Sequence, residues 1–235
     1  MIWRRLLAPF FLACAFVALL SGCATQKSAL SETVAALWDQ SWGNAAGTGI
    51  PSNPDMRYRY MRIEVQGRPP ALMVLGYVDA HPAGDIETWY SASREVIKTQ
   101  NGRIVGTAGL ETDWVAVRFP VQPVGWEAVP QGGVAFQRER DQMPGYIYGV
   151  QEMMRVTPLT TVPVEHLPAT LPLLVAQTYR WFREEAQATA GDALPSAWYA
   201  WALHRGTQTI VVSEQCLSHK LCLKMQRWPV QEAAQ

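Results

Sequence analysis

The sequence predicts an all-β fold, either an antiparallel β-sandwich or a partly open β-barrel, with a short N-terminal helix. From residue 60 onward, short segments of alternating or apolar residues are separated by turn signals, and no long helical pattern lies between them. The composition agrees with this fold class. Trp (10), Tyr (8) and Pro (16) are plentiful, and only 17% of the residues are charged.

The first predicted strands show both kinds of burial pattern. In residues 60–66, Met61, Ile63 and Val65 alternate with polar residues, which predicts a half-buried strand. Residues 71–78 form a continuous apolar run, which suits a well-buried strand.

An Asn-Gly dipeptide marks a hairpin further along the chain. Residues 88–99 and 103–107 flank Asn101-Gly102, and both residues of this dipeptide tolerate the positive φ that a tight hairpin turn requires. Residues 158–172 contain four prolines and therefore cannot form a central strand. Residues 173–188 fit a helix or a strand equally well. Further strands are expected at residues 113–119, 134–140, 146–156, 198–203, 207–214 and 221–228.

The N-terminus has the layout of a secretory signal. Arg4 and Arg5 precede an uncharged apolar run, residues 6–20, which is shorter than the roughly 20 residues that span a bilayer. The sequence Leu20-Ser21-Gly22-Cys23 resembles a lipobox, where a peptidase cleaves before a lipidated cysteine. A plain anchor helix is the alternative. Cleavage before Cys14 would leave too short an apolar segment.

These features predict three parts of the chain. Residues 1–22 are expected to be a signal peptide, residues 23–54 a lipidated tether, and residues 55–235 a single all-β periplasmic domain. Acyl chains on Cys23 would anchor the protein in a membrane. Ala24 follows, and by resemblance to other lipoproteins the absence of Asp there predicts the outer membrane, facing the periplasm. Residues 29–42 are expected to form a short amphipathic helix, which docks on the domain or lies on the bilayer.

The charge balance argues against one class of partner. Residues 1–22 carry two basic residues and no acidic one, so the remaining chain has 18 basic and 20 acidic residues and a net charge of −2. No basic excess is available to neutralise phosphate backbones, and nucleic acid is therefore not expected as a partner.

Two cysteines remain once Cys23 is lipidated. Cys216 and Cys222 are expected to form a disulfide in an oxidising compartment. A metal site with His219 between them is one alternative, although three ligands on a short loop without a fourth make a poor zinc site. Free thiols are the other alternative.

The sequence predicts no catalytic residues, no metal site and no cofactor. It contains no nucleophile elbow, zinc-protease motif or phosphate-binding loop. All four histidines lie in or beside turn signals: His81, His166, His204 and His219. Five aromatic residues could stack on sugar rings or contact a partner, whereas packing in the β core is the alternative. They are Trp89, Tyr90, Trp198, Tyr199 and Trp201.

Several motifs resemble the YjbF/GfcB lipoproteins, which are encoded alongside outer-membrane components for export of capsule or exopolysaccharide. Similarity covers residues 55–115 and, more weakly, residues 198–215; the segment with Cys216 and Cys222 matches no family feature. The resemblance implies an all-β periplasmic domain on an outer-membrane anchor that assists polysaccharide production or export, and it supplies no catalytic residues. The motifs are Tyr58-Arg59-Tyr60-Met61-Arg62-Ile63, Trp89-Tyr90-Ser91 and Asn101-Gly102-Arg103-Ile104-Val105-Gly106-Thr107-Ala108-Gly109-Leu110.

Three functional hypotheses result. The first is a non-enzymatic, lipid-anchored accessory protein that binds outer-membrane and periplasmic exopolysaccharide export proteins. The second is a glycan-binding module that contacts the polysaccharide itself through exposed aromatic residues. The third is a periplasmic hydrolase.

Overall fold

The structure, a computed structural model, describes residues 55, 57–187 and 193–230. The predicted signal peptide, the lipidation site Cys23, the tether and its helix lie outside these residues. Within the described ranges, no helix has the length and apolarity needed to cross a bilayer.

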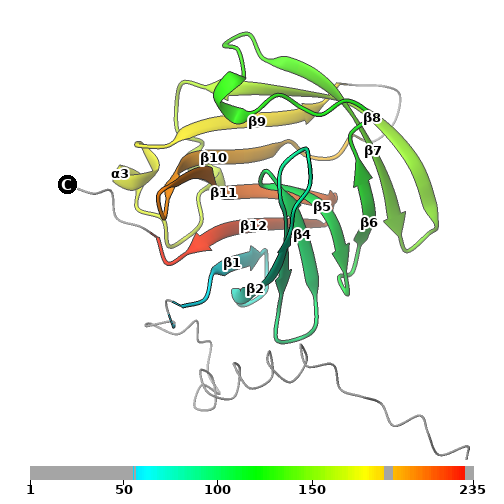
Figure 1. Ribbon diagram of the computed structural model, residues 1–235, viewed down its shortest axis with the longest axis horizontal. Coiled ribbons are helices and arrows are strands. Elements are labelled where there is room, and N and C mark those ends of the chain that lie inside the picture. Colours follow the sequence, from blue (N-terminus) through cyan, green and yellow to red (C-terminus); the bar gives the residue numbers. More distant parts are fainter. Residues whose placement is uncertain (1–54, 56, 188–192, 231–235) are drawn as a thin grey trace, which may run out of the picture. The chain divides into compact units, whose positions relative to one another are not determined.

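All strands of the described residues belong to one antiparallel sheet of 12 strands (Figure 1). The sheet order is β5-β4-β3-β2-β1-β12-β11-β10-β9-β8-β7-β6. The strands are β1 (Tyr60–Val65), β2 (Ala71–Asp79), β3 (Ile86–Tyr90), β4 (Val96–Gln100), β5 (Arg103–Ala108), β6 (Asp113–Arg118), β7 (Val134–Met143), β8 (Ile147–Leu159), β9 (Arg180–Ala186), β10 (Ala197–His204), β11 (Thr207–Ser218) and β12 (Leu221–Trp228).

The sheet curls until its two end strands lie close together. β5 and β6 are consecutive along the chain, yet no strand ladder joins them. Asp113 links them instead, because its carboxylate accepts hydrogen bonds from Thr107 Oγ1 at 2.9 Å and from the N–H of Gly109 at 3.0 Å. The result is a nearly closed barrel. The all-β prediction is confirmed, and of its two options the partly open barrel is the one observed.

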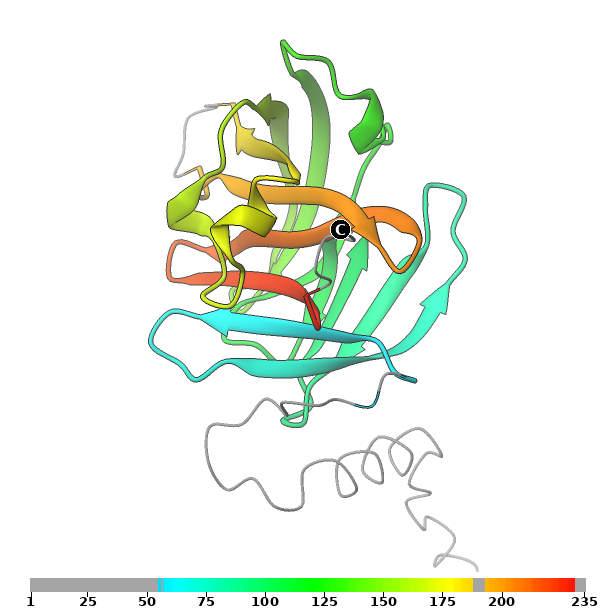
Figure 2. The same cartoon turned by 90° about the vertical axis from the view of Figure 1, so that its left-hand side faces the viewer.

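The first and last strands along the chain, β1 and β12, pair with each other in the middle of the sheet. β1 pairs with β12 from Tyr60 opposite Trp228 to Val65 opposite Leu223, and Figure 2 shows the two strands side by side. This pairing explains the alternation in residues 60–66. Met61 and Ile63 point into the barrel, where they meet residues more than 150 positions away in the sequence.

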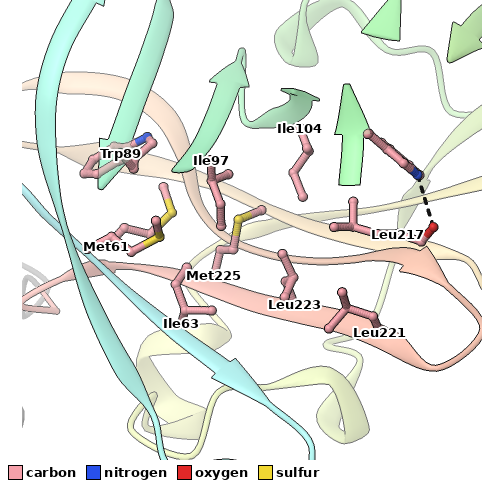
Figure 3. Packing of buried hydrophobic residues seen from close by; sticks show 11 residues of the cluster. Met61, Ile63, Trp89, Ile97, Ile104, Leu217, Leu221, Leu223 and Met225 are labelled. Carbon is pink, nitrogen blue, oxygen red and sulfur yellow. Dashed lines mark hydrogen bonds between the residues drawn. The ribbon is translucent and has the colours of Figure 1, made fainter. Parts of the chain in front are cut away.

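One half of the barrel interior is apolar. Its buried residues come from β1 to β6, β11 and β12, and they pack around Leu223, which has no exposed surface (Figure 3). The indole N–H of Trp114 donates to the backbone oxygen of Leu217 at 3.1 Å, the dashed line in Figure 3, so this buried polar group is satisfied. Together with Trp114, the cluster contains Met61, Ile63, Met73, Trp89, Ile97, Ile104, Leu217, Leu221, Leu223 and Met225.

A connecting segment covers the outer face of β10, β11 and β12. It contains the 3-10 helix η2 (Val164–His166) and the short helix α3 (Leu173–Ala176), and it lies in front of these strands in Figure 2. Leu171 and Ala176 of this segment pack on Ala200, Val211 and Val212 of the sheet. The strands beneath it are therefore buried on both faces.

Two expectations about strands need correction, and one assignment that the sequence left open is resolved. The expected strand at residues 88–99 is two strands, because Ser91 and Glu95 form a turn in which Ser91 Oγ accepts from the N–H of Glu95 at 3.0 Å. Within residues 173–188, which the sequence left open between helix and strand, the short helix α3 is followed by the strand β9. Pro158 lies inside β8, but beyond the last pair with β7, so it interrupts no ladder on that side.

The Asn-Gly hairpin is confirmed. Asn101 and Gly102 have φ values of 49° and 80° and connect β4 to β5. Gly102 is also required by packing, because a Cβ atom there would lie 2.4 Å from Cβ of Ile210.

The disulfide between Cys216 and Cys222 is present, with an S–S distance of 2.00 Å. Both residues lie in strands rather than in the loop that the sequence suggested. They face each other directly in the ladder between β11 and β12. The metal and free-thiol alternatives are therefore excluded in this structure.

Candidate functional site

Two of the five predicted contact aromatics lie inside the barrel. Trp89 is 0% exposed and Tyr199 is 1% exposed. Alternation along β3 and β10 directs both side chains inward, and Trp89 donates its indole N–H to Thr99 Oγ1 at 3.2 Å. These two residues have no surface to offer a glycan or a protein, and the expectation is corrected for them.

The other three aromatics are half-buried and lie apart. Tyr90 of β3 packs against Tyr77, with ring centroids 6.3 Å apart. Trp198 stacks on the ring of His166 at 4.1 Å, on the covered outer face of β10. Trp201 lies three positions after Trp198 on the same strand, so its side chain points to the opposite face. There it packs against buried apolar residues in the second half of the barrel interior. No common aromatic platform results, and a contact role for these three residues stays a prediction.

The second half of the barrel interior contains a row of charged side chains, which we call the charged cluster: Arg103, Arg138, Arg140, Glu152 and Glu184. Glu184 is 1% exposed and accepts from Arg103 Nε at 2.8 Å. Glu152 accepts from Arg138 Nε at 2.8 Å and from Arg140 Nε at 3.1 Å. Arg138 Nη1 also lies 4.0 Å from Glu184, so the ion pairs form one chain across β5, β9, β7 and β8.

Aromatic rings surround the charged cluster. The guanidinium carbon of Arg103 lies 4.1 Å from the ring of Trp126, and that of Arg138 lies 4.9 Å from Trp114. Tyr199 lies beside Glu184, and burial followed by the charge of Glu184 raises the pKa of its hydroxyl well above the ordinary value. The cluster is thus a desolvated, rigid structural unit.

A cavity of about 340 Å³ opens at one end of the barrel, above Arg103 and Trp126. We call it the end pocket. Loops between strands build one wall of it, including the 3-10 helix η1 (Trp126–Ala128), and the hairpin of β10 and β11 builds the other. Its volume lies in the range of about 300–1,000 Å³ that is usual for small-molecule sites. The side chains that matter for its chemistry are Asn101, Arg103, Trp126, Glu127, Trp201 and Gln208.

A larger, shallower groove of about 620 Å³ lies over β4, β5 and β6. Its walls are mainly aliphatic, with Val96, Val105 and Val115 among them, and its single aromatic ring is Phe119. That ring already packs on Phe136 at 5.9 Å. Seven polar or charged residues also line the groove, among them the buried Gln100 and Thr107, but unlike the end pocket it has no tryptophan in its lining.

The hairpin between β7 and β8 ends in three exposed apolar residues, which we call the hairpin tip. Tyr146, Ile147 and Tyr148 are 73%, 46% and 62% exposed. Below the tip, Asp141 accepts from the N–H of Gly149 at 2.9 Å and from Arg118 at 2.8 Å. The Arg118 guanidinium, and then the Gly149 N–H, hold the pKa of Asp141 below its usual value. The tip therefore projects from a hairpin whose base is fixed.

The histidines serve separate local roles. His166 Nδ1 lies 2.9 Å from Glu214 Oε2, which ties η2 to the sheet, and His81 Nδ1 lies 2.9 Å from the amide of Gln100. His204 is half-buried near Arg227, and its pKa falls to about 4, first through burial and then through the neighbouring arginines. Among the residues that the structure describes, no group of His, Cys, Asp or Glu side chains could hold a metal ion.

Sequence reasoning missed the charged cluster and the end pocket. One signal was present for the cluster, because Phe136, Arg138 and Arg140 recur at period 2, as do Glu152 and Met154. Such spacing places arginines on the same face as a core phenylalanine. No signal of this kind marked Trp126, which lies in a turn-rich segment with no strand periodicity.

These observations define a class of protein: a nearly closed, all-β barrel whose interior is partly apolar and partly charged, with an end pocket and an exposed aromatic hairpin tip. The chain belongs to the YjbF family, described as group 4 capsule polysaccharide lipoprotein GfcB, YjbF, whose model matches residues 35–177. This match confirms the family that the motifs indicated. It extends beyond residues 55–115 and stops before residues 198–215.

The fold is similar to that of a solved structure. It is the crystal structure of the hypothetical lipoprotein YmcC from Escherichia coli (K12), with a TM-score of 0.58 and 17% sequence identity. The alignment covers 89% of this chain and 100% of that chain. At this identity the likeness concerns the fold alone. A search of curated proteins gave no match.

Proposed function

We propose that this protein is a lipid-anchored accessory protein of exopolysaccharide or capsule production or export. In this proposal, acyl chains on Cys23 hold it at the outer membrane, and the domain faces the periplasm. It acts by binding outer-membrane and periplasmic export proteins, without catalysis and without a cofactor. Membership of a family of capsule polysaccharide lipoproteins supports the pathway, and the Leu20-Ser21-Gly22-Cys23 sequence supports the anchor.

The hairpin tip is the observation that carries protein binding as the mode of action. Two tyrosines and an isoleucine stand next to one another in the sequence and are all exposed. Tyrosine is enriched where protein interfaces concentrate their binding energy, because it buries a large ring at a small cost in side-chain entropy. Solvent-exposed apolar groups on a fixed hairpin are therefore a suitable docking surface.

Deletion of the gene in the producing bacterium tests the proposal. Secreted polysaccharide is expected to fall strongly, and the wild-type gene is expected to restore it. A Cys23→Ser version is expected to restore little, since the protein would lose its acyl anchor. Wild-type secretion by the deletion strain would contradict the proposed pathway.

A double variant tests the docking surface itself. Tyr146→Ser with Tyr148→Ser is expected to reduce secretion and to abolish co-purification with an outer-membrane export protein. The matched control is Val164→Ser with Leu174→Ser, which removes two other exposed apolar residues, 60% and 79% exposed, from η2 and α3. Full activity of the tyrosine variant would exclude the hairpin tip as the docking surface.

A further inference from the structure

We propose that the end pocket binds one uncharged sugar ring of a saccharide, which rests against Trp201. This inference goes beyond protein binding and does not depend on it. It also differs from a platform of aromatics on the sheet, because it uses Trp126, Arg103 and Gln208, which converge at the end of the barrel.

The floor of the pocket is held in place before any ligand arrives. Trp126 donates its indole N–H to the backbone oxygen of Asn101 at 2.8 Å, and its ring lies 4.8 Å from Tyr199 and 5.1 Å from Phe182. The Arg103 guanidinium lies against this ring. A floor fixed by so many contacts loses little entropy on binding, which favours affinity for a small ligand.

Trp201 supplies an aromatic wall that keeps part of its surface accessible. It lies opposite Arg180 in the ladder between β9 and β10, and the Arg180 guanidinium carbon is 5.3 Å from its ring. An aromatic face carries partial negative charge, so it attracts the polarised C–H groups on one side of a pyranose ring. Trp198, on the same strand, has its ring covered by His166.

Polar groups of the pocket match hydroxyls, which both donate and accept hydrogen bonds. The amide of Gln208 and the carboxylate of Glu127 are exposed at the rim. Deeper in, Arg103 is 5% exposed, and its Nη2 atom has no hydrogen-bond partner within the described structure. Donors and acceptors are thus present together, as a sugar with several hydroxyls requires.

Charge selects the class of saccharide. Arg103 and Glu127 are the charged residues that line the pocket, and Glu184 already neutralises Arg103 from behind. Among the lining residues, a carboxylated or sulfated ring would find only a cation that is already paired, and it would face the carboxylate of Glu127; Arg180, which lies against Trp201, does not line the pocket. The balance therefore favours a neutral ring over an acidic one.

The test uses the full chain, purified in detergent, and the exopolysaccharide that the same bacterium secretes. Partial hydrolysis followed by anion exchange gives neutral and acidic oligosaccharides as separate probes. Titration with the neutral fraction is expected to change tryptophan fluorescence in a saturable manner, and calorimetry is expected to give the same affinity. The acidic fraction is expected to bind at least tenfold more weakly. Absence of saturable binding, or preference for the acidic fraction, would overturn the proposal.

Two tryptophan variants locate the site. Trp201→Ala is expected to weaken binding by about tenfold or more, as loss of a central aromatic contact does at other binding sites. Trp198→Ala is the matched control, since it removes a half-buried tryptophan from the opposite face of the same strand, and it is expected to leave affinity unchanged. If Trp201→Ala fails to fold, Gln208→Ala provides the readout at an exposed position, with an expected loss of several-fold. Equal loss in Trp198→Ala, or none in Gln208→Ala and Trp201→Ala, would place the sugar elsewhere.

Discussion

The two halves of the barrel interior solve the same packing problem with different chemistry. Around Leu223 the interior is filled by aliphatic, methionine and tryptophan side chains. Around Glu184 it also contains arginines and glutamates, which are packed between aromatic rings beside a second cluster of buried apolar residues. The first half depends on burial of apolar surface. The second depends on pairing, because a buried charge without a partner costs several kcal/mol.

This difference indicates how each half would fail. An apolar core loses stability in proportion to the volume removed and the cavity left behind. A buried ion-pair network instead fails when one member is lost, although replacing a whole pair by apolar residues is often tolerated. The comparison also bears on function, since the charged half lies directly beneath the end pocket, which shares Arg103 with it.

The largest effect is expected in the charged half. Glu184→Gln keeps the shape of the side chain but leaves Arg103 and Arg138 without its charge, and is expected to lower the free energy of unfolding by about 3–5 kcal/mol. The double variant Arg103→Met with Glu184→Leu is expected to be clearly more stable than Glu184→Gln. Urea unfolding of both variants measures this. A double variant as unstable as Glu184→Gln would refute the pairing argument.

A matched pair of leucines tests the apolar half. Leu223→Ala is expected to cost about 2–5 kcal/mol, because this residue is 0% exposed and the neighbouring strands restrict collapse around the cavity. Leu203→Ala, at a position 59% exposed, is expected to change stability by less than about 0.5 kcal/mol. Chemical unfolding at constant pH compares them, and similar losses at both positions would contradict the assigned core.

The disulfide is expected to contribute less than either core. The double variant Cys216→Ala with Cys222→Ala removes a cross-link between two residues that are six positions apart in the sequence. Loop-closure entropy predicts a loss of about 2 kcal/mol. The measurement is the thermal midpoint of the double variant against the wild type under non-reducing conditions. An unchanged midpoint would contradict the loop-closure argument, because it would mean that the cross-link does not measurably destabilise the unfolded chain.

The smallest effect concerns pH at the rim of the barrel. The pKa of His204 is about 4 in the folded protein and near 6.5 when unfolded. The unfolded state therefore binds a proton first as pH falls, so this contribution to stability is complete above pH 6.5 and is lost between pH 6.5 and 4. Solvent screening of this half-buried group limits it to about 1 kcal/mol. His204→Gln is expected to flatten the stability profile across that window, and an unchanged slope would rule out His204 as its source.

Prediction from sequence succeeded where a local pattern and the fold required the same thing. The alternation of Met61, Ile63 and Val65 marked β1, and Asn101-Gly102 marked the hairpin that leads into β5. Success was lower where the deciding contacts were distant. Residues 173–188 were ambiguous, because the short helix α3 and the strand β9 both use apolar residues to cover or extend the sheet.

The candidate site was the part least accessible from sequence. Trp89 and Tyr199 have the residue types of a sugar-binding surface, yet strand parity buries them. Trp126 was not selected, although it forms the floor of the end pocket. An aromatic residue has the same chemistry in a core and in a pocket, so its role depends on what lies opposite it in space.

The sequence by itself determined the all-β class, most of the strands, the pairing of Cys216 with Cys222 and the family. These features follow from residue periodicity, turn chemistry and short motifs, which act over neighbouring positions. Only the tertiary structure decided that one sheet curls into a barrel, that Arg103 and Glu184 meet inside it and that a pocket forms at its end. Those contacts join residues about 80 to 110 positions apart, and no local pattern specifies which distant side chain will balance a buried charge.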